Sequence, residues 1–419
     1  MLSHMNNYIS QIYISNLFHL CDLTIRIDDP ECSNLIVTGK NGSGKTVLLN
    51  AVARRLEEIF PPENSNERKL EDSVLLGMYR DGLKDTVSDI ERAKLHYKID
   101  SLESRIKNKH YDVELTLNNL DYIVSEYHKG EFIVAYYQAA RKTDIQIPVN
   151  PTKPDLTERS SIRENLTSQL LFFLSDLKIQ EALARNENQM KDAEDIARWI
   201  SNFEMVLKSI FSDSDLELRF NYRDYSFTIV TQGKSFGFRE LSDGFVAILD
   251  IVADLILRMQ PTGSISSNFN DPGIVLIDEV ETHLHLQLQK EIMPLLTALF
   301  PNIQFIVTTH SPFVLNSLSN ATAYDLEHQE PIANLSEYSY QALTEGYFGV
   351  RTESDYALRR YEELKALLIK PELSDSEKVT ARQLINDIRK IPEASAPELV
   401  GAYRQLEIEF FDKIGKLGA

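Results

Sequence analysis

One run of eight residues constrains the fold of this chain more than any other feature. It matches the pattern G-x-x-x-x-G-K-[ST] without a gap and consists of Gly39, Lys40, Asn41, Gly42, Ser43, Gly44, Lys45 and Thr46. A short apolar run precedes it at residues 35–37, and apolar residues at helical spacing follow it from Val47 to Phe60. Strand, glycine loop and helix in this order form a phosphate-binding loop, because N–H groups at the helix N-terminus converge on phosphate oxygens. The pattern predicts that Lys45 reaches the β- and γ-phosphates of a nucleotide and that Thr46 offers its hydroxyl to Mg²⁺.

Two acidic residues follow a second segment that reads as a buried strand. Asp278 and Glu279 come directly after the apolar run 274–277, where phosphate-binding-loop proteins place the carboxylate that organises Mg²⁺. By themselves, two acids after a strand are more typical of a solvated helix start. The loop upstream reverses that preference. We therefore expect Asp278 to hold Mg²⁺ through its shell and Glu279 to orient and deprotonate the attacking water.

Two further polar residues lie at the ends of predicted strands. Gln138 directly follows the apolar and aromatic run 132–137, and His310 lies just past the strand 303–307. An imidazole in that position could hydrogen-bond a γ-phosphate. A lone histidine at a strand end is usually a satisfied polar group, so its interpretation depends on the rest of the set.

A serine-containing segment precedes the apolar helix that follows Val246. Ser242, Asp243 and Gly244 offer a hydroxyl and free backbone N–H groups at a helix N-terminus, which together make an anion site. As an isolated motif, Ser242 or Asp243 would be read as a helix N-cap.

The remaining pattern predicts an α/β protein with added helical parts. Alternating apolar residues between Ile12 and Ile27 indicate an antiparallel hairpin. We expect a helical insertion over 63–110, a mainly helical lobe over 150–245 and a helical extension over 346–419, which could contact a partner or another copy. Residues 1–345 would then form the head, a mixed sheet flanked by helices.

Composition places the chain among ordinary globular proteins. Its 419 residues are 43% hydrophobic, and its formal net charge of −19 repels nucleic acid and anionic lipid. Cys21 and Cys32 lack metal-site spacing and are expected to be small core residues in a reducing compartment. The N-terminus carries no secretory signal pattern, and charged residues interrupt the longest apolar stretch, 245–259. We expect a cytoplasmic protein with no membrane association.

Taken in order, these motifs resemble those of ABC-type ATPases over residues 8–345. The resemblance assigns Walker A to Gly39–Thr46, the Q-loop to Gln138, the signature to Leu241–Phe245, Walker B to Ile274–Glu279, the D-loop to His283–His285 and the switch histidine to His310. It implies an ABC-type head in which Gln138 joins Thr46 and Asp278 as ligands of Mg²⁺. Gln138, Glu279 and His310 would be the catalytic residues.

The same resemblance implies a homodimer that sandwiches two ATP molecules. The phosphates held by Walker A of one subunit would contact Ser242, Asp243 and Gly244 of the other subunit. Asp243 and Phe245 stand where the usual signature has glycine and glutamine, a form found among RecF-like and OLD-like ATPases.

A closer resemblance is to the stand-alone AAA-family ATPases of bacterial anti-phage systems. The segments Leu241–Phe245, Ile277–His285 and Val307–Pro312 are similar to those of the AriA family of the PARIS system and, next, to those of the PtuA family of Septu. This resemblance implies a sensor or scaffold that holds and then releases or activates a separate effector nuclease, of Toprim or HNH type. It also implies slow ATP hydrolysis, no nuclease activity in this chain, assembly beyond a dimer and a phage protein as trigger.

Two other functions stay open from the sequence. A RecF-like or SMC-like DNA-binding ATPase of DNA repair would use a small basic cluster at Arg105, Lys107, Lys109 and His110, although such a cluster is more often just a solvated face. A nucleotide-binding subunit of a transporter is less favoured, because Asp243 and the C-terminal extension do not suit a membrane partner.

Overall fold

The computed structural model describes most of the chain, which divides into two compact units, Met1–Tyr340 and Gln341–Ala419. The described residues are 8–27, 34–62, 112–141, 145–148, 159–260, 269–332, 338–346, 354–393 and 396–417, with a few isolated positions between them. The predicted insertion 63–110 falls outside these ranges apart from isolated positions, as do the basic cluster and Cys32. Each unit is described by itself below.

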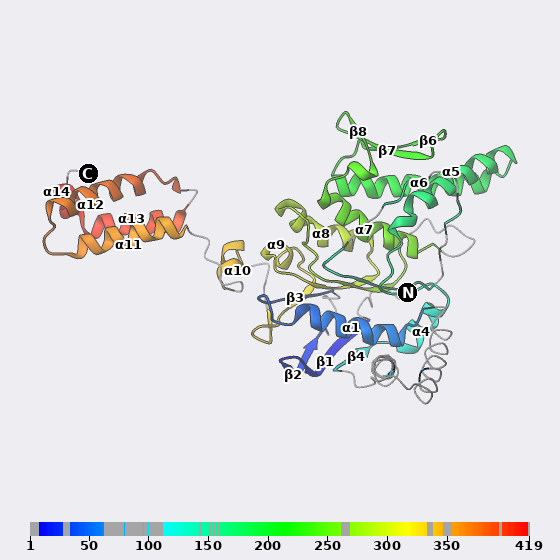
Figure 1. Ribbon diagram of the computed structural model, residues 1–419, viewed down its shortest axis with the longest axis horizontal. Coiled ribbons are helices and arrows are strands. Elements are labelled where there is room, and N and C mark those ends of the chain that lie inside the picture. Colours follow the sequence, from blue (N-terminus) through cyan, green and yellow to red (C-terminus); the bar gives the residue numbers. More distant parts are fainter. Residues whose placement is uncertain are drawn as a thin grey trace. The chain divides into compact units, whose positions relative to one another are not determined.

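A six-stranded sheet forms the centre of the first unit (Figure 1). Its strands, in spatial order, are β12 (Glu330–Ile332), β11 (Ala321–Asp325), β3 (Asn34–Thr38), β10 (Ile303–Thr308), β9 (Gly273–Ile277) and β5 (Ile133–Tyr137). The five strands from β11 to β5 are parallel, and β12 pairs antiparallel with β11, so the sheet is mixed as predicted.

Every residue of β3, β5, β9 and β10 is buried. Strands of a parallel sheet that is covered on both faces read as continuous apolar runs, and this is how these segments read in the sequence. Close packing requires a glycine at position 273, at the start of β9. A Cβ on Gly273 would lie only 2.6 Å from the Ile133 carbonyl oxygen.

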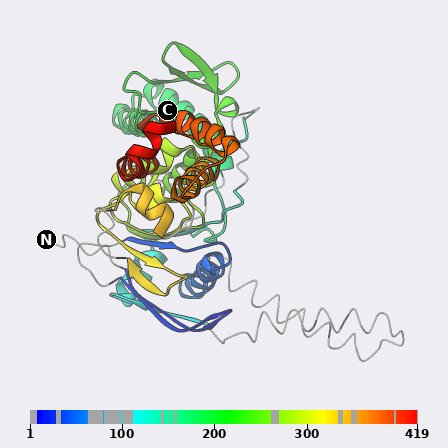
Figure 2. The same cartoon turned by 90° about the vertical axis from the view of Figure 1, so that its left-hand side faces the viewer.

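One face of the sheet is covered by a helix and then by a smaller sheet. The helix α1 (Lys45–Ile59) lies between the six-stranded sheet and a three-stranded sheet with the order β2-β1-β4 (Figures 1 and 2). The three strands are β1 (Ile9–Leu17), β2 (Leu20–Arg26) and β4 (Val113–Leu117), and α4 (Leu120–His128) follows them. β1 and β2 pair antiparallel, which confirms the predicted hairpin.

A continuous apolar core joins these layers. It includes Ile12 and Ile25 from the hairpin, Leu48 from α1, and Leu276 and Ile306 from the central sheet. Burying such side chains stabilises the fold by roughly 1.5–3 kcal/mol for each one. This packing holds the start of α1 against the end of β3.

The other face carries helices and a second small sheet, which Figure 1 shows in green and yellow-green. These elements are α5 (Leu170–Asn186), α6 (Met190–Phe211), β6 (Glu217–Asn221), β7 (Ser226–Thr231), β8 (Lys234–Gly237), α7 (Asp243–Arg258) and α8 (Leu286–Leu299). The lobe 150–245, predicted to be mainly helical, contains α5 and α6 and also this three-stranded sheet. Its last strand, β8, has four residues, which are too few to show an alternating pattern in the sequence.

Short elements complete the first unit. They are η1 (Thr167–Gln169), η2 (Phe238–Glu240), α9 (Pro312–Leu315) and α10 (Tyr340–Gly346), which crosses into the second unit. None of the helices in the described part of the chain combines the length and the apolar run that crossing a bilayer needs.

The second unit is a helical bundle with a core of its own. It contains α11 (Asp355–Ile369), α12 (Asp375–Arg389), α13 (Pro397–Glu409) and α14 (Phe411–Leu417). Leu364, Ile385 and Tyr403 belong to its apolar core. Ser374 and Glu377 form a capping box at the start of α12, which satisfies backbone N–H groups that have no partner within the helix. The helical character predicted for the C-terminal extension is confirmed.

The expectation for Cys21 is wrong. Cys21 is exposed rather than buried. Leu23 and Ile25 are buried at alternate positions of β2, and the same period would bury Cys21. The alternation breaks at Asp22, whose φ angle is 53°, so Leu20 is buried and both Cys21 and Asp22 are exposed.

Candidate functional site

The strand order brings the predicted motifs to one edge of the central sheet. β3, β10, β9 and β5 are consecutive parallel neighbours, so their carboxyl ends lie side by side. The glycine loop follows β3, His310 follows β10, Asp278 and Glu279 follow β9, and Gln138 follows β5. Ligands of open α/β sheets bind outside the carboxyl ends of the strands, which makes this edge the candidate site.

The glycine loop has a backbone that only glycine adopts easily. Gly39, Gly42 and Gly44 have φ angles of 139°, 85° and 95°. A Cβ on Gly39 would in addition lie 2.8 Å from the Ser43 Oγ. The loop therefore turns tightly and leads directly into α1, whose first residue is Lys45.

Lys45 is buried inside this loop and held by oxygen atoms. Its Nζ donates to the carbonyl oxygens of Gly39 and Lys40 at 2.7 and 3.0 Å and to the Ser43 Oγ at 3.4 Å. Burial lowers the pKa of the ammonium group, and the nearby carboxylates, Glu279 first among them, oppose that shift. The loop thus carries a positive charge where a phosphate group would be recognised.

Two residues of the loop, Lys40 and Asn41, lie at the surface of the protein. Lys40 is exposed and pairs with Glu327 at 2.8 Å, and Asn41 is exposed as well. The Thr46 side chain points to the next motif, because its Oγ1 donates to the Asp278 Oδ1 at 3.3 Å.

Asp278 is buried between two hydroxyl groups. Its Oδ1 accepts from Thr308 Oγ1 at 2.6 Å as well as from Thr46 Oγ1. Hydroxyl and carboxylate oxygens are ligands that Mg²⁺ prefers, so Thr46 and Asp278 fit the predicted metal site. The backbone N–H of Asp278 donates to the Tyr137 carbonyl at 2.8 Å, so the exposed Gln138, which is next to Tyr137 in the chain, begins beside Asp278.

Glu279 and His310 face each other next to the metal position. The Glu279 Oε1 lies 3.8 Å from the His310 Nε2, which is too long for a hydrogen bond, and both side chains are partly exposed. Burial and the Lys45 charge lower the pKa of His310, so its imidazole is neutral at pH 7. The Glu279 carboxylate can accept a hydrogen bond from a water molecule, and the His310 imidazole can donate one to a phosphate oxygen.

Three residues that position this pair were missed by the sequence analysis. Thr308 Oγ1 accepts from the Glu279 N–H at 2.8 Å, and the half-buried Glu281 accepts through its carboxylate from Thr309 Oγ1 at 2.8 Å and from the His310 N–H at 2.5 Å. The sequence shows these residues as polar positions at the ends of buried strands. It does not show which groups they contact, because those contacts depend on the order of the strands in the sheet.

The predicted signature segment starts α7. Ser242 is the N-cap residue and is exposed together with Asp243, and no side-chain hydrogen bond caps this helix in the described part of the chain. Gly244 is buried and closely packed. A Cβ at this position would lie 3.2 Å from Leu288 and 3.3 Å from the His283 carbonyl oxygen. The hydroxyl of Ser242 is therefore presented at the surface.

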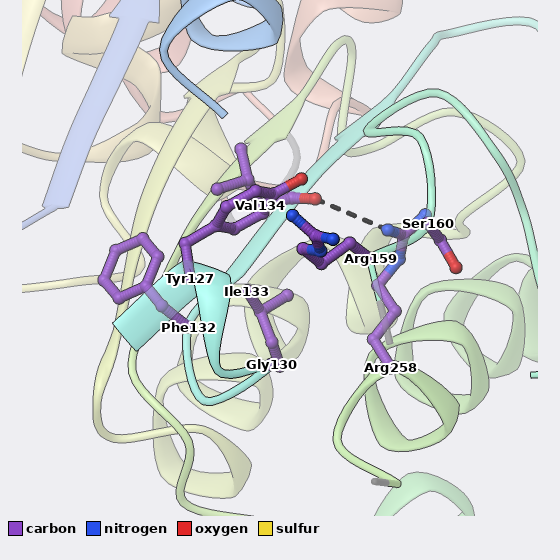
Figure 3. A pocket seen from close by; sticks show the side chains of 8 residues that line it. All are labelled: Tyr127, Gly130, Phe132, Ile133, Val134, Arg159, Ser160 and Arg258. Carbon is purple, nitrogen blue, oxygen red and sulfur yellow. Dashed lines mark hydrogen bonds between the residues drawn. The ribbon is translucent and has the colours of Figure 1, made fainter. Parts of the chain in front are cut away.

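A buried ion pair anchors the other end of α7 to the central sheet. Arg258 Nε donates to Asp254 Oδ2 at 2.8 Å, and Tyr137 at the end of β5 donates its hydroxyl to the same oxygen at 2.5 Å. Arg258 also lines a pocket of about 20 Å³ and reaches the Val134 carbonyl there (Figure 3). That space holds about one water molecule and cannot hold a nucleotide.

The fold and the edge residues together define a P-loop ATPase with an ABC-type order of motifs. A family model described as "AAA domain, putative AbiEii toxin, Type IV TA system" (AAA_21) matches residues 35–316. Because this match covers more than half of the chain, the protein belongs to that ATPase family.

Relatives and a solved structure show similarity at low identity. Retron Vc95 probable ATPase of Vibrio cholerae serotype O1 biovar El Tor is 24% identical over 83% of this chain and 80% of its own. Septu protein PtuA of Bacillus mycoides (strain KBAB4) is 22% identical over 91% of this chain but only 50% of its own, so this chain spans about half of that PtuA. The SMC head domain from Thermotoga maritima is 14% identical over 75% of this chain and 94% of its own, with a TM-score of 0.35.

Proposed function

We propose that this chain binds ATP with Mg²⁺ at the carboxyl edge of the central sheet and hydrolyses it to ADP and phosphate. The observation that carries the proposal is the gathering of Thr46, Asp278, Glu279 and His310, from segments that follow three different strands, around one point beside Lys45. Each of these residue types has a separate task in phosphoryl transfer.

Each residue of the site is proposed to have one role in ATP hydrolysis. Lys45 and the glycine loop bind the phosphates, and Thr46, Asp278 and Gln138 would hold Mg²⁺. When bound, the metal neutralises charge on the phosphate oxygens. Glu279 accepts a proton from water as the water oxygen attacks the γ-phosphorus and the bond to ADP breaks. A neutral His310 can donate a hydrogen bond to the γ-phosphate.

The second half of the nucleotide site is proposed to come from another copy. The exposed Ser242 hydroxyl and the backbone N–H groups at the start of α7, including those of Asp243 and Gly244, suit an anion presented from outside the chain. We propose a homodimer closed by two ATP molecules, and a higher homo-oligomer built from such dimers.

The cellular role is proposed from the resemblance to anti-phage ATPases and from the retron and Septu relatives. We propose a sensor or scaffold that holds a separate effector nuclease, of Toprim or HNH type, and releases or activates it when a phage protein alters the ATP-bound state. On this proposal the ATPase turns over slowly and cuts no nucleic acid itself. AriA-like assembly is preferred to PtuA-like assembly.

A phosphate-release assay with MgATP tests the enzymatic part. Turnover should be measurable and should disappear in Lys45→Ala, because that change removes a charge-assisted contact to the phosphates; affinity for MgATP should fall by roughly 10–100-fold. Lys129→Ala, which removes an exposed lysine paired with Glu126, is the matched control. Turnover in Lys45→Ala at the parental rate would refute the site.

The cellular part needs a different experiment. Tagged Glu279→Gln protein recovered from its host in MgATP should bring down a stoichiometric protein with a nuclease fold. Recovery of DNA with no protein partner would instead favour a DNA-repair ATPase.

A further inference from the structure

An arginine that the sequence analysis did not select reaches the catalytic edge from the segment after β5. Arg141 lies three residues beyond Gln138, and its Nη2 donates to the main-chain carbonyl oxygen of Glu279 at 3.1 Å. Its Nε and Nη1 are buried and have no hydrogen-bond partner among the described residues. Burying a guanidinium group that makes a single hydrogen bond to a carbonyl oxygen costs free energy of folding.

The residue that it holds has an unusual backbone. Glu279 has a φ angle of 45°, in the left-handed region that residues with a Cβ seldom occupy. Such a conformation persists only where the surroundings impose it. In this conformation the carboxylate of Glu279 lies beside His310.

Hydrogen bonds to both of its peptide groups impose it. The N–H of Glu279 donates to Thr308 Oγ1 at 2.8 Å, on the β10 side, and its carbonyl accepts from Arg141, on the β5 side. The same carbonyl also accepts from the Thr282 N–H at 3.0 Å, and the Val280 N–H donates to the Thr308 carbonyl at 3.2 Å. Arg141 is therefore the side chain that adds to a main-chain network holding the peptide groups before and after Glu279. Rotation about either would swing the carboxylate away from the position where it can take a proton from water.

The electrostatic surroundings keep the guanidinium in place. Burial lowers the pKa of Arg141, and the carboxylates of Asp250 on α7, Glu281 and Asp278 act in the opposite direction. The arginine therefore stays charged while it lies between the segment of Gln138 and the acid pair.

We propose that Arg141 is a positioning residue that holds Glu279 in its hydrolytic orientation and ties that orientation to the segment carrying Gln138. This inference rests on the proposed ATP hydrolysis by Glu279. It assigns no contact between Arg141 and the nucleotide.

Kinetics of Arg141→Met and Arg141→Lys test the proposal. In Arg141→Met, kcat for MgATP should fall by roughly 10–100-fold, the effect of losing one charge-assisted hydrogen bond. The Kd for MgATP should change less than about twofold, because the phosphate contacts remain. Arg141→Lys keeps a charged donor and should recover part of kcat even if the methionine variant folds poorly. Arg219→Met removes an exposed arginine on β6 and is the control.

A double-mutant cycle separates positioning from a general structural effect. If Arg141 acts through Glu279, the Arg141→Met change should cost nothing further in a Glu279→Gln background. Multiplied losses in the double variant, or an unchanged kcat in Arg141→Met, would overturn the inference. Absence of turnover in the unmodified chain would refute the proposed hydrolysis itself, so the two failures are distinct.

Discussion

The carboxyl edge of the central sheet and the N-terminus of α7 differ in how their polar groups are satisfied. At the sheet edge, Lys45, Asp278 and the backbone of Glu279 each have a partner within the chain. At the start of α7, Ser242 and Asp243 are exposed, and the helix begins without a side-chain cap within the described residues. The polar groups of the first region are thus satisfied within the chain, whereas the second is the surface that we propose to meet a nucleotide held by another copy.

The contrast extends along α7 itself. Its C-terminal half is fixed by the Asp254–Arg258 pair and Tyr137, while Ser242 and Asp243 at its start meet solvent. A rigidly anchored helix with an open N-terminus is suited to presenting donors in a constant direction. The two regions therefore make different predictions for chemistry, stability and assembly.

The largest effect is expected at the sheet edge. Glu279→Gln should reduce turnover by about 10²–10⁴-fold, because the amide cannot accept the proton from water. Binding of MgATP should persist, since the loop and Lys45 are unchanged. Phosphate release and equilibrium binding measure the two quantities, with Glu217→Gln as a surface control. Parental turnover would show that Glu279 is not the general base.

The anchor of α7 should affect stability rather than chemistry. Asp254→Asn should lower the free energy of unfolding by about 3–5 kcal/mol, because Arg258 stays buried and loses its carboxylate. Urea denaturation measures this loss. Asp375→Asn removes the exposed partner of Lys378 and should leave the free energy of unfolding nearly unchanged, because solvent screens a surface ion pair. Equal effects of the two changes would contradict the buried anchor.

The open N-terminus of α7 should affect assembly alone. Ser242→Arg should leave each protomer able to bind MgATP yet prevent ATP-induced dimers, because a long charged side chain occupies the presented surface. Sedimentation in the Glu279→Gln background, where ATP is retained, measures the dimer. Ser376→Arg in α12 is the control. Dimers that persist in Ser242→Arg would remove the shared site.

The smallest effect is expected at the amino end of β9, away from both regions. Burial, with Glu131 nearby, raises the pKa of Asp271 from 3.8 to about 6. The folded state therefore binds this proton more tightly than the unfolded state, and the stability that it contributes is lost as pH rises through about 6. Asp271→Asn should raise Tm by about 2–4 °C at pH 8. Thermal melts should show this gain shrinking as pH falls toward 4, and a gain independent of pH would contradict the assignment.

Site residues could be predicted from the sequence where they belong to a recognisable local pattern. Gly39–Thr46 could be recognised because eight consecutive residues specify one backbone, and Asp278 and Glu279 because they end an apolar strand. Arg141 and Glu281 could not be recognised. Each acts on the main chain of a residue in the site, through hydrogen bonds that no spacing in the sequence reveals.

The sequence by itself determined the glycine loop, the N-terminal hairpin and the four buried strands that lead to the site, because alternation, apolar runs and glycine-rich turns are local properties of the chain. Only the tertiary structure decided that β3, β10, β9 and β5 lie in that order. Strand order depends on pairing between segments that are far apart in the chain, such as Leu35 with Ile306, and local patterns carry no record of it. That order brings Thr46, Asp278, Glu279 and His310 together, and it brings Arg141 to the carbonyl of Glu279.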